Sequence, residues 1–134
     1  MTRATAPRAP FDDLLGLEVV DASPDRVVAT ITIRSDMWQP YGIVHGGVYS
    51  TVVESTCSIG ADMWIRAQGR SVVGVANHTN FLRSVSDGVL RVEALPVHRG
   101  RSQQLWQAVI HDERQRLIAR GEVRFANLRP ESGD

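Results

Sequence analysis

The longest uninterrupted apolar pattern in the chain runs from Gly46 to Arg66. Apolar and small residues fall on most sides of a helix drawn through these positions, and no proline interrupts it. A helix with such a circumference must be covered by the rest of the protein. One glutamate, Glu54, stands inside the pattern, and a carboxylate is costly to bury without a partner. The pattern therefore predicts a long central helix in which Glu54 is the exceptional residue.

Apolar and polar positions alternate before and after this helix, which predicts strands. One strand is expected at Arg26–Arg34, in a hairpin with a segment that starts at Leu17. Four further strand candidates lie at Ser71–Leu82, Gly88–His98, Ser102–His111 and Gln115–Ala126. The segments between these four strand candidates are short, so consecutive strands are expected to be antiparallel neighbours. This order predicts an α+β fold, with the helix laid across the concave face of a curved sheet.

Composition limits the classes of protein to which the chain can belong. We expect one domain over residues 11–129, with a flexible leader at 1–10 and a flexible tail at 130–134. The formal net charge is zero, so no nucleic-acid or membrane partner is expected. A single cysteine, Cys57, and a leader without an apolar core favour a cytoplasmic location. All fifteen basic residues are arginine, which excludes a Schiff-base lysine and a phosphate-loop lysine.

The start of the predicted helix carries two adjacent glycines, Gly46 and Gly47. Helix N-termini present unpaired backbone N–H groups, and glycine lets a substrate oxygen approach them. A carbonyl placed there would be polarised as in an oxyanion hole, and the Gly46 amide is the best single candidate. The alternative is that both glycines only allow a tight entry of the chain into the helix.

Glu54 follows Gly46 by eight residues, which is about 12 Å along a helix axis. Reacting atoms must lie within about 3–3.5 Å of each other, so one carbonyl group cannot meet both residues of the same helix. If both act on one substrate, they must come from two subunits of a homodimer. The alternative for Glu54 is a solvent-facing or internally paired carboxylate.

Three more residues are candidates for supporting roles. Ser58 lies one turn beyond Glu54 and could hold a water or steady the carboxylate, or simply ease packing. His45 could donate a hydrogen bond to the turn or to a substrate, and a purely structural role is equally open. Gln39 is an amide in the preceding loop without an assignable partner. The other histidines have no metal-ligand spacing.

These motifs resemble those of hotdog-fold thioesterases. The resemblance spans residues 11–126 and is nearest to the 4-hydroxybenzoyl-CoA thioesterases of the Arthrobacter type and to the phenylacetate-pathway thioesterases. The histidine of the glycine turn precedes the acid Glu54 by nine residues, as in that family. The matching runs are Val44-His45-Gly46-Gly47, Phe11-Asp12-Asp13-Leu14-Leu15-Gly16, Asn80-Phe81-Leu82-Arg83, Gly100-Arg101-Ser102 and Arg116-Leu117-Ile118-Ala119.

The resemblance implies a sheet wrapped around the central helix, dimers with a continuous sheet, and homotetramers. It assigns Glu54 as the nucleophile or general base, and the Gly46 amide as the group that polarises the thioester carbonyl. It places Gln39 and His45 in the site, and Ser58 where relatives have an assisting threonine. Some relatives with an aspartate in place of Glu54 also have a serine early in the next strand, where this chain has Gly74. The residues implied for binding CoA phosphates are Arg83, Arg101 and Ser102.

The resemblance predicts an acyl-CoA thioesterase, and aromatic residues near the site are compatible with an aromatic acyl group. No cofactor is expected, because CoA is part of the substrate. The alternatives are a hotdog hydratase or dehydratase, which would need an acid–base pair that we do not find, and a non-catalytic acyl-CoA-binding protein.

Overall fold

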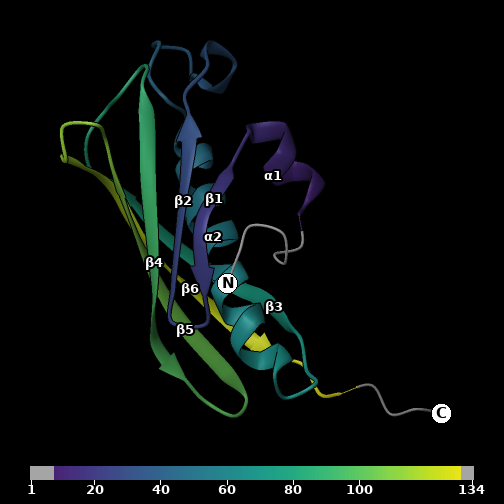
Figure 1. Ribbon diagram of the computed structural model, residues 1–134. Helices are drawn as coiled ribbons and strands as arrows, with labels where there is room; N and C mark the ends of the chain where they lie inside the picture. Colours follow the sequence, from purple (N-terminus) through teal and green to yellow (C-terminus); the bar gives the residue numbers. More distant parts are fainter. Residues whose placement is uncertain (1–7, 131–134) are drawn as a thin grey trace.

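The computed structural model describes residues 8–130, which form one curved antiparallel sheet with a long helix across it (Figure 1). The elements are α1 (Pro10–Leu15), β1 (Glu18–Ser23), β2 (Arg26–Thr32), the short 3-10 helix η2 (Ser35–Met37), α2 (Gly46–Arg66), β3 (Val72–Phe81), β4 (Val89–Arg99), β5 (Gln103–His111) and β6 (Leu117–Asn127). The strand order is β1-β2-β4-β5-β6-β3. The predicted α+β class and the bounds of the central helix are confirmed.

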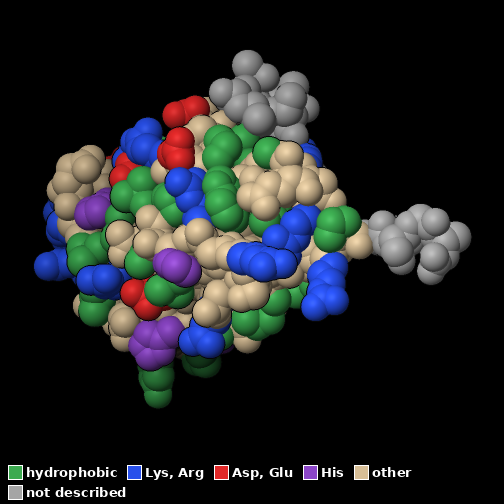
Figure 2. All heavy atoms as spheres, turned by 90° about the horizontal axis from the view of Figure 1, so that it is seen from below, with side chains coloured by type: hydrophobic (Ala, Val, Ile, Leu, Met, Phe, Trp, Pro, Cys, Tyr) green, Lys and Arg blue, Asp and Glu red, His purple; other side chains and the backbone are tan. Residues whose placement is uncertain are grey.

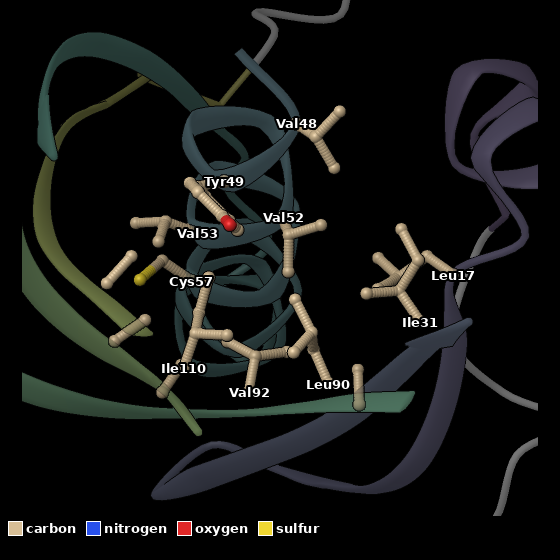
Figure 3. Close-up of a cluster of buried hydrophobic side chains, with 14 of the residues drawn as sticks. Leu17, Ile31, Val48, Tyr49, Val52, Val53, Cys57, Leu90, Val92 and Ile110 are labelled. Atoms are coloured by element: carbon tan, nitrogen blue, oxygen red, sulfur yellow. The ribbon is translucent and has the colours of Figure 1, made fainter. Parts of the chain in front are cut away.

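One face of α2 forms the core together with the concave face of the sheet. The helix contacts all six strands. Figure 3 shows Val52, Val53 and Cys57 of α2 beside Val92 and Ile110 of the sheet. The opposite face of α2, which includes Glu54 and Ser58, is not covered by the sheet. The expectation that the chain covers the whole circumference of the helix therefore holds for one side only.

The second half of α2 is held against the sheet by a buried polar network. The indole N–H of Trp106 donates to Gln104 Oε1 at 2.8 Å, and Gln104 Nε2 donates to the Ala61 carbonyl at 3.1 Å. Gln104 also donates to Asn127 Oδ1 at 2.9 Å. A Cβ at Gly60 would lie 2.5 Å from the Trp106 ring, so only glycine permits this close approach. These contacts fix where α2 lies on the sheet, and hence where Glu54 lies.

The sheet order corrects one prediction. The strands β3 and β4 were expected to be neighbours, but β3 pairs with β6 and β4 pairs with β2. The connection between them packs on the loop before α2 instead of making a tight turn. Its carbonyls accept hydrogen bonds from that loop, Val85 O from Val44 N–H and Ser86 O from the Trp38 indole, at 2.9 and 2.8 Å. This connection carries the chain from the edge strand β3 past β6 and β5 to the inner strand β4.

The strand β3 forms one edge of the sheet, and no described strand pairs with its outer side. Its exposed side chains include large apolar ones, with Val75 at 57% exposure and Phe81 at 55%. An edge strand of this kind presents unpaired backbone groups to another chain. The open edge of β3 is therefore a surface on which a second sheet edge can pair.

Most of the expected leader and tail lie outside the described residues, since residues 1–7 and 131–134 are not described. Within the described part, Pro10 already belongs to α1, one residue before the predicted start of the domain. No helix among the described residues is long and apolar enough to cross a membrane.

Candidate active site

His45 forms the N-cap of α2. Its Nδ1 accepts a hydrogen bond from the Gly47 N–H at 2.8 Å, and its ring is exposed. A neutral imidazole that accepts at Nδ1 carries its proton on Nε2. The sequence suggested a donor, whereas the structure shows that His45 accepts a hydrogen bond within the turn. Its Nε2–H remains available to an incoming group.

Gly46 begins α2, and its amide N–H has no acceptor among the described residues. A Cβ at this position would lie 2.3 Å from Cε2 of Phe81, whose ring packs on the glycine. Both expectations for this glycine are therefore compatible with the structure, because it permits close packing and also leaves a donor without an acceptor. An unpaired amide of this kind is a group that can polarise a carbonyl oxygen.

Glu54 lies on the uncovered face of α2, beside β3, with its side chain exposed. Asn77 Nδ2 donates to Glu54 Oε1 at 3.3 Å and to the Ser50 carbonyl at 2.9 Å. The Thr79 hydroxyl donates to Asn77 Oδ1 at 2.7 Å, which orients the amide. No arginine or histidine between residues 8 and 130 forms a salt bridge with Glu54. Asn77 thus binds one carboxylate oxygen of Glu54, and the other oxygen has no hydrogen-bond partner among the described residues.

Position 74 also borders the carboxylate. A Cβ at Gly74 would lie 3.6 Å from Glu54 Oε2, which is ordinary contact distance. Some aspartate-bearing relatives are expected to have a serine at this position, and the structure places the position beside the acid. Asn77 was missed by the sequence analysis, because nothing in the polar run from 77 to 80 distinguishes it.

Two further candidate site residues, Ser58 and Gln39, lie on α2 and in the loop before it. Ser58 lies one turn beyond Glu54, and both line a cleft of about 430 Å³. Gln39 is half-buried in a small hairpin closed by the bridge between Trp38 and Val44, and its Oε1 accepts from the Tyr41 N–H. Its amide hydrogens make no hydrogen bond within the described part of the chain. Gln39 therefore retains donors near the start of α2.

The residues implied for CoA binding lie at opposite ends of β3. Arg83 is exposed just after the end of this strand. Arg101 and Ser102 lie in the β4–β5 turn, close to the other end, where Asn127 N–H donates to the Ser102 carbonyl. Figure 2 looks onto the end of the molecule that bears this turn and shows exposed arginines spread over it. A ten-residue strand spans roughly 33 Å, so the structure does not bring Arg83 and Arg101 together within one chain.

The aromatic residues near the site fall into different environments. Trp38 lines a cleft at the start of α2, whereas Tyr41 is exposed in the hairpin loop. Trp64 lies under the Arg99 guanidinium, 5.4 Å from it. Tyr49 is buried beside Phe81, with ring centroids 5.8 Å apart. Trp38 is therefore the aromatic side chain among these four that borders an open cleft.

The Tyr49 hydroxyl is buried and has no hydrogen-bond partner among the described residues. Burial raises the pKa of Tyr49 from 10.0 to about 12. Because the folded-state pKa is raised, the unfolded chain loses this proton first, so the free energy of unfolding falls as the pH rises from 10 toward 12 and is unaffected by this titration below pH 10. We expect Tyr49→Phe to abolish this part of the alkaline loss of stability. At pH 7 the variant should gain about 1 kcal/mol, since an unpaired buried hydroxyl is removed.

Urea unfolding of wild type and Tyr49→Phe at pH 7, 10 and 11 measures this effect. Tyr41→Phe is the matched control, because Tyr41 is 88% exposed. An alkaline loss of stability of equal size in Tyr49→Phe and wild type would contradict the assignment.

Two other kinds of site, a cysteine nucleophile and a metal centre, are not indicated by the described residues 8–130. Burial raises the pKa of the Cys57 thiol above its ordinary value, and the charge of Glu54 adds to the shift. A buried thiol of this kind is a poor nucleophile. No group of three or more His, Cys, Asp or Glu side chains in this range could hold a metal ion.

An antiparallel sheet curved around one long helix, with a glycine turn at the helix start, is the hotdog thioesterase fold. Residues 41–119 match the family described as the thioesterase superfamily. The Mycobacterium tuberculosis protein Rv1847 is 46% identical over 121 residues, which cover 89% of this chain and 86% of that protein. A solved structure of Rv1847/MT1895 has a TM-score of 0.90 at 45% identity, covering 92% of this chain and 100% of that one.

Two further relatives bear the names of thioester-cleaving enzymes. The proofreading thioesterase EntH of Cronobacter turicensis is 34% identical, with 76% of this chain and 74% of that protein covered. The 1,4-dihydroxy-2-naphthoyl-CoA hydrolase of Listeria monocytogenes is 31% identical, with 81% and 87% covered. The chain belongs to the thioesterase superfamily and is a thioester hydrolase.

Proposed function

We propose that this enzyme hydrolyses an acyl-CoA to the free acid and CoA, at a site shared between two copies of the chain. One observation carries the proposal: an amide without an acceptor and an exposed carboxylate lie on the same helix, and both border the open edge strand β3. Phe81 at one end of β3 packs on Gly46, and Gly74 and Asn77 further back contact Glu54. The two groups are about 12 Å apart in one chain, so a second chain is needed to bring them together.

Pairing of two β3 edges supports such a shared site. In a two-fold symmetric antiparallel pair, the end of one strand lies opposite the start of the other. Phe81 of one copy, with Gly46 beneath it, would then lie near the first residues of β3 of the partner. Those residues lead to Gly74, which borders the carboxylate of Glu54. The amide of one subunit would approach the acid of the other, and a dimer would contain two such sites.

The proposed chemistry follows from the two groups. The Gly46 N–H polarises the thioester carbonyl and stabilises the negative charge that develops on its oxygen. The Glu54 carboxylate either attacks the carbonyl carbon or takes a proton from a water that attacks it. The C–S bond then breaks, and the CoA sulfur leaves and takes up a proton. Attack by water gives the free acid directly, whereas attack by Glu54 gives a mixed anhydride that a water molecule then hydrolyses to the free acid and the regenerated carboxylate. Asn77 donates to one carboxylate oxygen, which leaves the other for the reaction.

Neighbouring side chains fit supporting roles in this reaction. The Ser58 hydroxyl, one turn beyond Glu54 on the same face, can hold the attacking water. At the start of α2, beside the Gly46 N–H, the Nε2–H of His45 and the amide of Gln39 supply further hydrogen-bond donors. Gly47 leaves the approach to the N-terminus of α2 free of a side chain.

CoA phosphates would be held by arginines from both subunits. Arg83 and the Arg101–Ser102 turn lie at opposite ends of β3 in one chain, yet antiparallel pairing of two β3 strands brings one copy's Arg83 to the other copy's turn. Arginine suits phosphate because its planar fork donates bidentate, charge-assisted hydrogen bonds. The pairing of two β3 strands that brings Gly46 of one copy to Glu54 of the other would therefore also bring the two parts of the CoA site together.

The relatives support the chemical class. A CoA hydrolase and a proofreading thioesterase among them favour thioester hydrolysis over the hydratase and non-catalytic alternatives. We further propose an aromatic acyl group, as in the 4-hydroxybenzoyl-CoA and phenylacetate-pathway enzymes that the motifs resemble. The proposal also includes a cytoplasmic location and a homotetramer built from two such dimers.

The experiment is a thiol-release assay with aromatic and aliphatic acyl-CoAs, combined with light scattering to measure the mass of the particle. We expect hydrolysis of at least one aromatic acyl-CoA and a mass of at least two chains. Release of no thiol from any member of the series would refute the acyl-CoA assignment. Full activity in a monomeric protein would refute the shared site.

A further inference from the structure

The helix α1 lies beside the uncovered face of α2 and is fixed there at both ends. The Ser55 hydroxyl donates to Asp12 Oδ1 at 2.6 Å. The Arg34 guanidinium donates to the carbonyls of Leu14 and Leu15, at 3.2 and 3.0 Å. A short helix held by side-chain hydrogen bonds in this way can serve as the rigid wall of a cleft.

Of the clefts that open along α1, Phe11 lines two, and the cleft of about 430 Å³ described above is not one of them. The first, which we name the His45 cleft, has a volume of about 400 Å³ and adjoins the start of α2. The second, the Glu54 cleft, has a volume of about 330 Å³ and adjoins the carboxylate. Phe11 and Thr51 are the residues common to both linings. The Phe11 ring is 56% exposed, so it occupies space between the two clefts without belonging to the core.

The two clefts differ in chemistry. The His45 cleft is lined largely by apolar side chains, Leu15, Met37, Trp38 and Val48 besides Phe11, and its polar members are Asp36, His45 and Thr51. The Glu54 cleft is polar apart from Phe11, and its lining includes Ser50, Ser55 and Asn77. An apolar acyl group gains free energy by burial in the first cleft and gains little in the second.

The position of the His45 cleft favours the acyl group as its occupant. His45 and Gly47 line it, and Gly46 lies between them in the chain. A thioester carbonyl at the Gly46 N–H would have its acyl carbon directly beside this cleft. The CoA part would extend the opposite way, toward Arg83 and the edge of β3.

We propose that the acyl group of the substrate lies in the His45 cleft and that Phe11 sets the maximum length of that group. This inference rests on the proposed function and adds the place and size limit of the acyl group. The ring of Phe11, which lines both clefts, would then close the far end of the His45 cleft and limit it to an aromatic ring or a short chain. Removal of the ring would join the two clefts and admit longer acyl groups.

The test is the dependence of kcat/KM on acyl length, from acetyl- to decanoyl-CoA with benzoyl- and phenylacetyl-CoA added. We expect Phe11→Ala to move the optimum to longer chains and to raise kcat/KM at least about ten-fold for acyl groups beyond the wild-type optimum, since each further buried methylene contributes about four-fold. Leu14→Ala is the matched control, because Leu14 lies on the same helix, is 69% exposed and lines neither cleft. We expect it to keep the wild-type optimum.

A second measurement is independent of hydrolysis. S-alkyl-CoA thioethers of the same lengths have no carbonyl to attack, and their Kd can be measured by calorimetry. We expect Phe11→Ala to tighten the binding of the longer thioethers selectively. An unchanged length dependence in both measurements, or an equal shift in Leu14→Ala, would overturn the proposal. A shift in thioether binding without hydrolysis of any thioester would reject the proposed function and leave the acyl position standing.

Discussion

Glu54→Gln is expected to lower kcat for thioester hydrolysis by about 10²–10⁴-fold, because the amide can neither attack the carbonyl nor accept a proton from water. The substitution keeps the shape of the side chain, and its Oε1 can still accept the hydrogen bond from Asn77. KM should change little, since the carboxylate acts on the reacting atoms and not on CoA. The measurement is steady-state thiol release with wild type and variant at equal protein concentration.

A carboxylate elsewhere on the same helix provides the control. Asp62 lies two turns beyond Glu54 and forms an ion pair with Arg66. Asp62→Asn should retain nearly full kcat, because this carboxylate already has a cationic partner. Wild-type kcat in Glu54→Gln would remove Glu54 from the mechanism.

Gly46→Pro is expected to lower kcat by about 10²–10³-fold, the cost of losing one oxyanion donor. Proline has no N–H, and it is tolerated at the first position of a helix, where the amide has no partner within the helix. The preceding residue, His45, has φ −63° and ψ 133°, which is the conformation that proline favours in its neighbour. The substitution therefore removes the donor with little disturbance of the backbone. Thiol release measures the loss.

Gly46→Ala is the matched variant for this prediction. It introduces the same Cβ against the Phe81 ring but keeps the N–H, so it measures the steric part alone. The difference in kcat between the alanine and proline variants is then the contribution of the donor. Equal kcat in the two variants would assign any loss to packing and would contradict the oxyanion role.

The two inactive variants can also be combined. In a mixed dimer of Glu54→Gln and Gly46→Pro, one site has both variant residues and the other has neither. Random pairing should then restore about one quarter of the wild-type activity, because half of the dimers are mixed and half of their sites are intact. If the two residues acted within one subunit, mixing would restore nothing.

The sequence predicted well what depends on local pattern. The bounds of α2 follow from an unbroken apolar run between a glycine turn and Arg66, and the structure reproduces them. The strand segments were found within a few residues, because alternation and turn residues are local properties. The pairing of β3 with β6 was missed, since strand order is decided by contacts between residues far apart in the chain, such as Phe81 opposite Ala119.

The candidate site was predictable where a motif or a helical spacing defined it. The eight-residue spacing placed Gly46 and Glu54 on one helix but too far apart for one substrate atom, and the continuous α2 agrees. The contacts of Glu54 with Asn77 and of Gly46 with Phe81 could not be read from the sequence. Both depend on how the edge strand β3 lies against α2, which is a tertiary property.

The open edge of β3 has a consequence for how the protein can change over evolutionary time. In the proposed dimer this edge meets a copy of itself, so every substitution on it occurs twice in the same interface. A change that helps or harms the pairing is doubled, and no compensating change can be made on one partner alone. Residues such as Phe81, which contact both the helix start and the edge, should tolerate less variation than the exposed surface of α1.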